Sequence, residues 1–200
     1  MSEKNNSFYD GENERRSDFW TQWSADKSHK EIGEMIAKFE AEAEHDGLTG
    51  LYNIRGWGRL VERFAQLADR ENKPIAFLVA DINKFKAVND TYGHDAGDQA
   101  LIFVGGVLGM VSRLSDTVAR TGGDEFAIML PFATLEEAQA LRERVSEELS
   151  RSLDEMDDED LLSQANISIS IGIAMRMPRE NVKKAIKSAD EDMYSVKRNR

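Results

Sequence analysis

Two short apolar runs with a glycine and carboxylate segment between them place the strongest constraint on the fold. The runs are residues 117–119 and 126–130, and Gly122, Gly123, Asp124 and Glu125 lie between them. Paired glycines between strand-like runs predict a tight antiparallel hairpin, because glycine reaches positive φ without a Cβ clash. The bare backbone also lets a bulky anion approach, and adjacent carboxylates suit magnesium. The segment therefore predicts both a strand pair and a site for a metal ion and phosphates.

The pattern on either side of this hairpin predicts an α+β sheet with helices packed on it. The continuous apolar run 75–80 is typical of a central, buried strand that ends at Asp81. Residues 167–173 alternate isoleucine with serine and glycine, which predicts a half-buried strand. Asn53 can cap one helix, and Thr134 with Glu137 forms a capping box that opens another. The expected order is helix, strand, helices, hairpin, helix, strand, helix.

Composition narrows the class of protein. A formal charge of −11 argues against a general nucleic-acid binder, which would carry a basic face. With 40% hydrophobic residues the chain can build a core, and with no cysteine it has no disulfide frame. The start of the chain lacks the apolar segment of a signal peptide, and the longest near-apolar run, 101–111, is about half a membrane span. We therefore expect a soluble, cytoplasmic protein without a membrane segment.

We expect the first 45 residues to form an N-terminal tail and helix, separate from a main domain at 46–200. Residues 1–27 are polar and rich in turn formers, apart from three aromatic residues. Residues 28–44 carry apolar side chains spaced four, three and four apart, which indicates a helical extension. Packing of this helix on the domain and a dimer contact both remain open. The residues concerned are Phe19, Trp20 and Trp23 in the tail, and Ile32, Ile36, Phe39 and Ala43 in the helix.

A dense polar segment, residues 81–98, follows the buried strand, at the place where such sheets hold ligands. Together with the hairpin, this segment resembles the signature stretches of the GGDEF family, the diguanylate cyclases. Residues 46–53 resemble the opening motif of the family, and residues 168–174 and 189–194 resemble its closing motifs. The resemblance covers residues 46–200. It implies a palm-like, ferredoxin-related sheet with a βααββαβ core.

The resemblance also implies an activity, the condensation of two GTP molecules into cyclic di-GMP with release of two pyrophosphates. Each subunit of a two-fold homodimer would hold one GTP. Asp81, Asp124 and the backbone carbonyl of Ile82 would bind two Mg²⁺ ions, with Mn²⁺ as a possible substitute. Glu125 would either take the hydroxyl proton or support the metals, and the sequence leaves these two roles open.

The resemblance places further residues along the nucleotide. Lys86 would stabilise charge on the phosphates, although a lysine at this position can equally be a solvated residue on a helix surface. Asn89 and Asp98 would read guanine, since a carboxylate can accept hydrogen bonds from both guanine donors. The other residues expected to contact substrate are Leu48, Phe85, His94 and Lys197, although a lone histidine can equally hydrogen-bond locally.

Arg113 and Asp116 form an RxxD pair, and five residues separate Asp116 from Gly122. At this spacing the pair resembles the product-binding inhibitory site of the family. Arginine can stack on and bind a guanine, and aspartate can accept from its Watson–Crick edge. Elsewhere the same pair would be an ion pair at a helix end. We expect cyclic di-GMP to bind here as an inhibitor.

The sequence departs from the family pattern at three places. Ile54 replaces an arginine, and Asn83 replaces an aspartate. After Lys197 the family usually continues with a Gly-Arg-Asn segment, and the arginine of that segment is absent here. Either the chain is trimmed, or Arg198 and Arg200 substitute for that arginine. A catalytically weak or silent GGDEF module that binds GTP or cyclic di-GMP as a receptor is the alternative function. A nucleic-acid polymerase palm shares the two-metal logic but conflicts with the charge of −11.

Overall fold

The computed structural model describes residues 31, 33–35, 43–157 and 159–198. The chain divides into two units, residues 1–43 and Glu44–Arg200, and the second unit carries the fold described below. The predictions for the N-terminal tail and for Ile32, Ile36 and Phe39 lie outside the described residues, as does Arg200.

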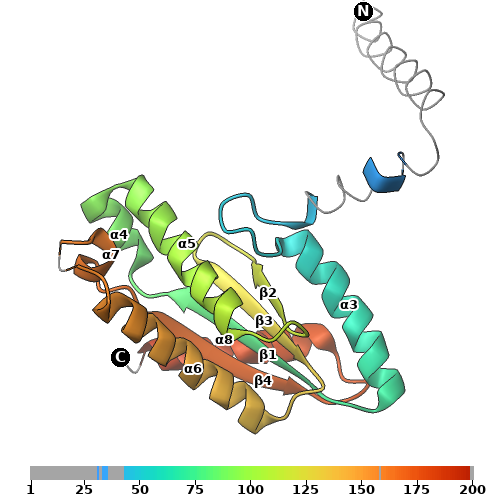
Figure 1. The fold of residues 1–200 in the computed structure, drawn as a ribbon. Coiled ribbons are helices and arrows are strands. Elements are labelled where there is room, and N and C mark those ends of the chain that lie inside the picture. The colour runs from blue at the N-terminus through green and yellow to red at the C-terminus, as the bar shows by residue number, and fades with distance from the viewer. Residues whose placement is uncertain (1–30, 32, 36–42, 158, 199–200) are drawn as a thin grey trace, which may run out of the picture. The chain divides into compact units, whose positions relative to one another are not determined.

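The described residues form a four-stranded antiparallel sheet in the order β2-β3-β1-β4, which places β1 at its centre (Figure 1). The elements follow the chain in the order α3, β1, α4, α5, β2, β3, α6, α7, β4, α8, which confirms the predicted α+β fold and its βααββαβ core. Their bounds are α3 Ile54–Glu71, β1 Ile75–Ile82, α4 Phe85–Tyr92, α5 His94–Val111, β2 Thr117–Arg120, β3 Glu125–Pro131, α6 Leu135–Asp154, α7 Leu161–Gln164, β4 Ile169–Arg176 and α8 Val182–Arg198.

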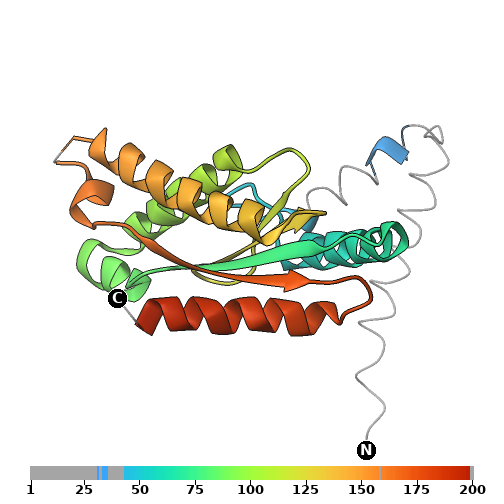
Figure 2. The ribbon, with the colours of Figure 1, turned by 90° about the horizontal axis from the view of Figure 1, so that it is seen from below.

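Both faces of the sheet are covered by helices, as Figure 2 shows edge-on. Along β1, alternate side chains point to opposite faces. Leu78 and Ile82 belong to the core with α5 and α6, whereas Ile75 and Phe77 belong to the core with α3 and α8. This double coverage explains why β1 is a continuous apolar run rather than an alternating one. By the same period of two, Asp81 lies on the face that α3 and α8 cover.

The predicted caps are confirmed at the helices that frame the sheet. The Asn53 side chain accepts hydrogen bonds from the amides of Arg55 and Gly56 at the start of α3. Thr134 and Glu137 form the complete capping box of α6, with both reciprocal bonds present. These caps satisfy amides that an isolated helix end would leave without partners.

Two sequence expectations about the strands need correction. The central strand, expected to end at Asp81, extends one residue further to Ile82. The strand predicted as half-buried is covered on both faces in its first half, because Ser170 and Gly172 pack beneath α8. A Cβ on Gly172 would lie 2.0 Å from the backbone nitrogen of Met193, so glycine permits the close approach of this helix.

The hairpin between β2 and β3 is confirmed, but the predicted reason for its glycines is wrong. Neither Gly122 nor Gly123 has a positive φ; the glycines that do are Gly50 and Gly93. A Cβ on Gly123 would meet nothing within 4 Å, and one on Gly122 would meet the flexible side chain of Glu125. The turn therefore does not require these glycines, and their effect is a backbone left bare toward the solvent.

The outer strand β4 carries a polar cap on its free edge. The backbone amide of Ile173 donates to the Asp192 carboxylate of α8 at 2.8 Å.

In the part of the chain that the structure describes, no helix combines the length and apolar composition needed to cross a bilayer.

Candidate active site

Strand register brings acidic residues together at one end of the sheet. Asp81 of β1 lies opposite Glu125 of β3 on one side and opposite Ser170 of β4 on the other. The amide of Ile82 donates to the carbonyl of Asp124 at 3.2 Å, which holds the hairpin end against β1. Like charges directly opposite each other in a sheet are destabilising. An arrangement that costs stability at one sheet end indicates a functional site.

The electrostatics of Glu125 confirm that these carboxyl groups are close. Partial burial of the Glu125 carboxyl group raises its pKa. The negative charges of Asp81, Asp124 and Asp190 raise the pKa further, whereas the Lys197 ammonium opposes the rise. Four carboxyl groups from three segments of the chain therefore act on one another at this end of the sheet, together with the Lys197 ammonium.

Lys197 reaches this group from the last turn of α8. Its ammonium forms an ion pair with the Asp81 carboxylate, whose side chain is only 13% exposed. The close packing of α8 on Gly172 sets the height of the helix above β4. Asp81 points to the same face of the sheet, so the ion pair follows from the strand period and the helix position together.

The donor set at this end of the sheet fits a magnesium ion. Carboxylates and backbone carbonyls are the hard oxygen ligands that Mg²⁺ prefers, and Mg²⁺ usually keeps several waters. Asp81, Asp124 and the carbonyl of Ile82 are candidates to hold it. Within residues 43–157 and 159–198, no three His, Asp or Glu side chains already stand at metal-binding distances from one another. The ammonium of Lys197 supplies the positive charge at Asp81.

The connection from β1 to α4 is shaped for an anion. Lys84 precedes α4 with a left-handed backbone, φ 55°, and provides no side-chain cap. The amides of Phe85 and Lys86 have no acceptor within the helix and carry the positive end of its dipole, whereas the amide of Ala87 donates to the Lys84 carbonyl. Asn83, Lys84 and Lys197 line one cavity of about 570 Å³ beside the first turn of α4. A polyanion such as a triphosphate matches this arrangement.

The predicted guanine readers meet at the joint between α4 and α5. A Cβ on Gly97 would lie 1.9 Å from the Asn89 amide oxygen and 3.2 Å from the Phe85 ring. Gly97 therefore allows Asn89 and Phe85 to pack against α5, next to the exposed Asp98. His94 is the exposed first residue of α5, and Leu48 packs against the core that α5 shares with the sheet.

Lys86 lies apart from the carboxylate group. Its ammonium is 2.8 Å from Asp90, one turn further along α4, and the two side chains are 86% and 62% exposed. This is a helix-surface ion pair of small energetic value. The role of Lys86 on the phosphates stays a prediction.

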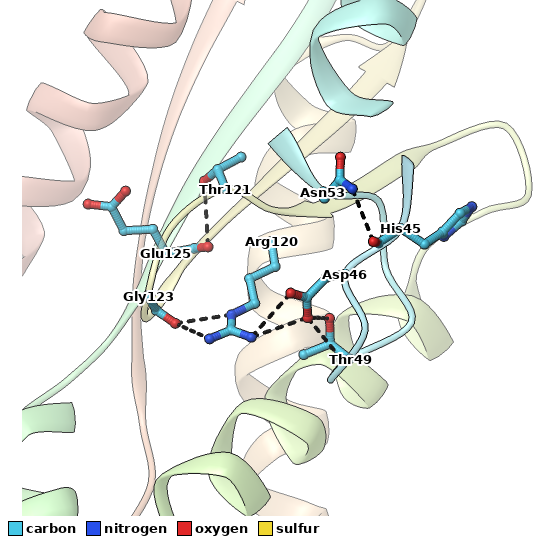
Figure 3. Close-up of polar contacts among 8 residues, drawn as sticks. All are labelled: His45, Asp46, Thr49, Asn53, Arg120, Thr121, Gly123 and Glu125. Carbon is cyan, nitrogen blue, oxygen red and sulfur yellow. Dashed lines mark hydrogen bonds and ion pairs between the residues drawn. The ribbon is translucent and has the colours of Figure 1, made fainter. Parts of the chain in front are cut away.

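Arg120 connects the β2–β3 hairpin to the loop that opens the domain (Figure 3). Its Nε and Nη2 donate to the carbonyl of Gly123 at 3.1 and 2.8 Å, and its Nη1 donates to the Asp46 carboxylate at 3.2 and 3.3 Å. Asp46 also accepts from the amide and hydroxyl of Thr49. Burial alone raises the pKa of Asp46, but the bonds from Thr49 and Arg120 outweigh it and lower the pKa below its ordinary value.

The RxxD pair lies in the loop between α5 and β2. The Asp116 carboxylate accepts from the amide of Arg113 at 2.8 Å, and the Arg113 guanidinium lies 3.1 Å from Glu137 of α6. A cavity of about 410 Å³ adjoins both residues. Arg113 is exposed, so it can exchange Glu137 for a ligand.

Sequence reasoning missed three residues that the structure brings to the site: Asp46, Arg120 and Asp190. All three lie within the recognised motifs, but neither motif position nor period shows which distant group a side chain will meet. Arg120 and Asp46 are 74 positions apart. An arginine directly after the apolar run 117–119 was the signal available for Arg120, since a charge next to a core strand normally has a partner.

Comparison with known proteins assigns the family. The profile of the family described as diguanylate cyclase, GGDEF domain matches residues 43–200. The chain belongs to this GGDEF family. The matched range includes the hairpin and the acidic strand end described above.

Individual relatives agree with this assignment. The probable diguanylate cyclase DgcC of Escherichia coli (strain K12) is 32% identical over 178 residues, which is 88% of this chain and 46% of DgcC. The diguanylate cyclase DosC of the same strain is 35% identical over 170 residues, 84% of this chain and 36% of DosC. The structure of the coiled coil and GGDEF domain of DgcB from Caulobacter crescentus, in complex with c-di-GMP, matches with a TM-score of 0.78 at 28% identity and 94% coverage of both chains. The chain thus spans less than half the length of these two curated relatives.

Proposed function

We propose that this protein is a diguanylate cyclase that converts two GTP molecules into cyclic di-GMP and two pyrophosphates. The observation that carries the proposal is the carboxylate group at the end of β1 and β3. Asp81 and Glu125 oppose each other across the strands, beside Asp124 at the hairpin end. Partial burial, together with the negative charges of this group, raises the pKa of Glu125. Such a group costs stability, and binding a divalent cation would offset that cost.

The chain's own residues account for most of the proposed chemistry. Asp81, Asp124 and the Ile82 carbonyl would hold Mg²⁺, which when bound neutralises phosphate charge and makes the attacking hydroxyl more acidic. Glu125 adds negative charge that draws the cation into the group. Arg120 fixes the Gly123 carbonyl, so that the hairpin end keeps its position when the cation binds. Phosphoryl-type transfer depends mainly on such positioning and charge neutralisation.

The nucleotide would lie along α4. Its phosphates would meet the amides of Phe85 and Lys86 at the start of α4, and the ammonium of Lys197 would reach them from the cavity beside that turn. Asn89 and Asp98 would bind the guanine. An adenine would leave the Asp98 carboxylate without its donors, at a cost of about 1–3 kcal/mol, which predicts GTP over ATP.

One protomer binds one GTP in this proposal, so two copies must face each other to form both new bonds. We propose a two-fold homodimer in the cytoplasm, where GTP is available. The test is incubation of the chain with GTP and Mg²⁺ at several protein concentrations, with chromatography for cyclic di-GMP. Specific activity should rise with protein concentration in the range where dimers form.

A site variant and a surface control test whether product formation depends on the proposed site. Asp124→Asn should abolish product formation, whereas Glu62→Gln on the exposed surface of α3 should leave it unchanged. Product from Asp124→Asn at the wild-type rate would refute the site. No product from the wild type, with GTP still bound, would reassign the chain as a nucleotide-binding receptor module.

We also propose product inhibition through Arg113 and Asp116. Arg113→Ala should weaken cyclic di-GMP binding in calorimetry and relieve inhibition, because the product loses a bidentate donor. Arg63→Ala, an exposed arginine on α3, is the matched control. Unchanged product affinity in Arg113→Ala would refute this part of the proposal and leave the cyclase reaction untouched.

A further inference from the structure

Lys197 lies between two places that its ammonium can occupy. One is beside the Asp81 carboxylate, with which the ammonium forms an ion pair. The other is the cavity of about 570 Å³ that Lys197 shares with Asn83 and Lys84 beside the first turn of α4. In Figure 2 the C-terminal end of α8 lies at the same end of the sheet as α4. A lysine on a flexible four-carbon stem can move between two such positions without a change in the backbone.

The charges around Asp81 favour an internal cation. Asp81, Asp124 and Asp190 all act on Glu125, and Lys197 is the group that opposes them. The Asp81 side chain is 13% exposed and that of Lys197 36%, so water shields the pair only in part. A divalent cation also prefers carboxylate oxygens, so it would compete with the ammonium for Asp81.

We propose that Lys197 is a built-in counter-cation that competes with a divalent metal ion for Asp81 and releases Asp81 when a polyphosphate occupies the cavity beside α4. In the nucleotide-free protein the lysine weakens metal binding. With nucleotide bound, the phosphates attract the ammonium, and Asp81 becomes available to the metal. The metal and the nucleotide therefore bind with positive cooperativity, which reduces binding of metal to a site without substrate. The nucleotide half of this inference rests on the proposed function, and the metal half does not.

The direct test measures Mn²⁺ binding to the nucleotide-free chain by electron paramagnetic resonance of the free ion. Lys197→Met should bind Mn²⁺ about tenfold more tightly than the wild type, since a charge-assisted hydrogen bond is no longer lost on binding. Lys197→Arg keeps the charge and should remain near the wild type. Lys187→Met is the matched control, because Lys187 pairs with Glu191 on the exposed surface of the same helix. Equal or weaker Mn²⁺ binding in Lys197→Met would overturn the inference.

Thermal unfolding with and without Mg²⁺ separates this role from a merely structural ion pair. Lys197→Met should melt at a lower temperature than the wild type without metal and should gain more from added Mg²⁺. A structural pair predicts a loss that Mg²⁺ does not restore, and that result would also overturn the inference. If the methionine variant does not fold, Lys197→Gln removes the same charge and is held to the same two outcomes.

Neither measurement contains GTP, so the inference and the proposed function fail separately. Tighter Mn²⁺ binding in Lys197→Met together with an inactive wild type would refute the cyclase proposal alone. A wild type that makes cyclic di-GMP, with Mn²⁺ affinity unaffected by Lys197→Met, would refute the role of Lys197 alone.

Discussion

Replacing Arg120 should affect both stability and catalysis, because its guanidinium joins the opening loop to the end of the hairpin, beyond the backbone hydrogen bonds that Tyr52 makes with β2. It contacts the Asp46 carboxylate in the opening loop and the Gly123 carbonyl in the hairpin (Figure 3). Arg120→Met removes both contacts while keeping most of the side-chain volume. Arg120→Lys keeps the charge but loses the fork that reaches two acceptors at once.

The expected cost follows from the burial of the pair. The Arg120 and Asp46 side chains are 16% and 23% exposed, so the contact is largely shielded from water. A hydrogen bond to a charged group contributes about 1.5–3 kcal/mol, and Asp46 retains its bonds from Thr49 in the variant. We expect Arg120→Met to lower the free energy of unfolding by about 3 kcal/mol and Arg120→Lys by about half as much. A cycle with Asp46→Asn should give a coupling of about 1–2 kcal/mol.

Urea unfolding measures the stability, and cyclic di-GMP formation measures the catalytic effect. Freeing the Gly123 carbonyl lets the adjacent Asp124 move, so kcat should fall about tenfold to a hundredfold with a smaller change in KM. The folded-state pKa of Asp46 lies below its ordinary value of 3.8. Its ionised form therefore stabilises the fold above pH 3.8, and this contribution is lost as the pH falls through the folded-state pKa. The stability difference between wild type and Asp46→Asn should shrink over that acidic range.

Arg59→Met is the control for this series. Arg59 also pairs with a carboxylate, that of Glu44, but its side chain is 62% exposed, so the loss should stay below about 1 kcal/mol. The reasoning is refuted if Arg120→Met loses no more stability than Arg59→Met. Normal kcat in a folded Arg120→Met variant would show that the hairpin keeps its position without the guanidinium.

Three further substitutions test the electrostatics and packing by chemical unfolding. Glu125→Gln should stabilise the metal-free protein by about 0.5 kcal/mol, since it removes a like charge across the strands; a loss would contradict the crowding. Asp69→Ala should destabilise the fold, because Arg176, 3% exposed, keeps a buried charge without its carboxylate, and a variant as stable as the wild type would contradict this. Gly172→Ala should cost at least about 2 kcal/mol by displacing α8, whereas Gly58→Ala, with open space around its Cβ, should be neutral or stabilising.

The elements of this fold were predictable where their signals are local. The cap at Asn53 and the capping box at Thr134 each depend on side chains within three or four residues of the helix start. The hairpin depends on a short polar segment between two apolar runs. The strand period also places Asp81 on one face of β1. Such features need no knowledge of the tertiary structure.

The contacts that organise the site were not predictable in the same way. Lys197 and Asp81 are 116 positions apart, and their meeting depends on the height at which α8 packs over Gly172. Arg120 meets Asp46 only because the opening loop lies against the hairpin. Motif resemblance located these residues in the sequence but gave Arg120 and Asp46 no role. The positive φ expected at the hairpin glycines was wrong, since a loop of this length can turn with ordinary backbone angles.

The carboxylate of Asp192 at the free edge of β4 has a consequence for how two copies of the chain can associate. It occupies the amide of Ile173, which a strand from another molecule would otherwise bind. A negative charge at that position also opposes the approach of the same edge from a second copy. Sheet extension between copies is therefore disfavoured. Copies of the chain are therefore expected to associate through surfaces other than this sheet edge.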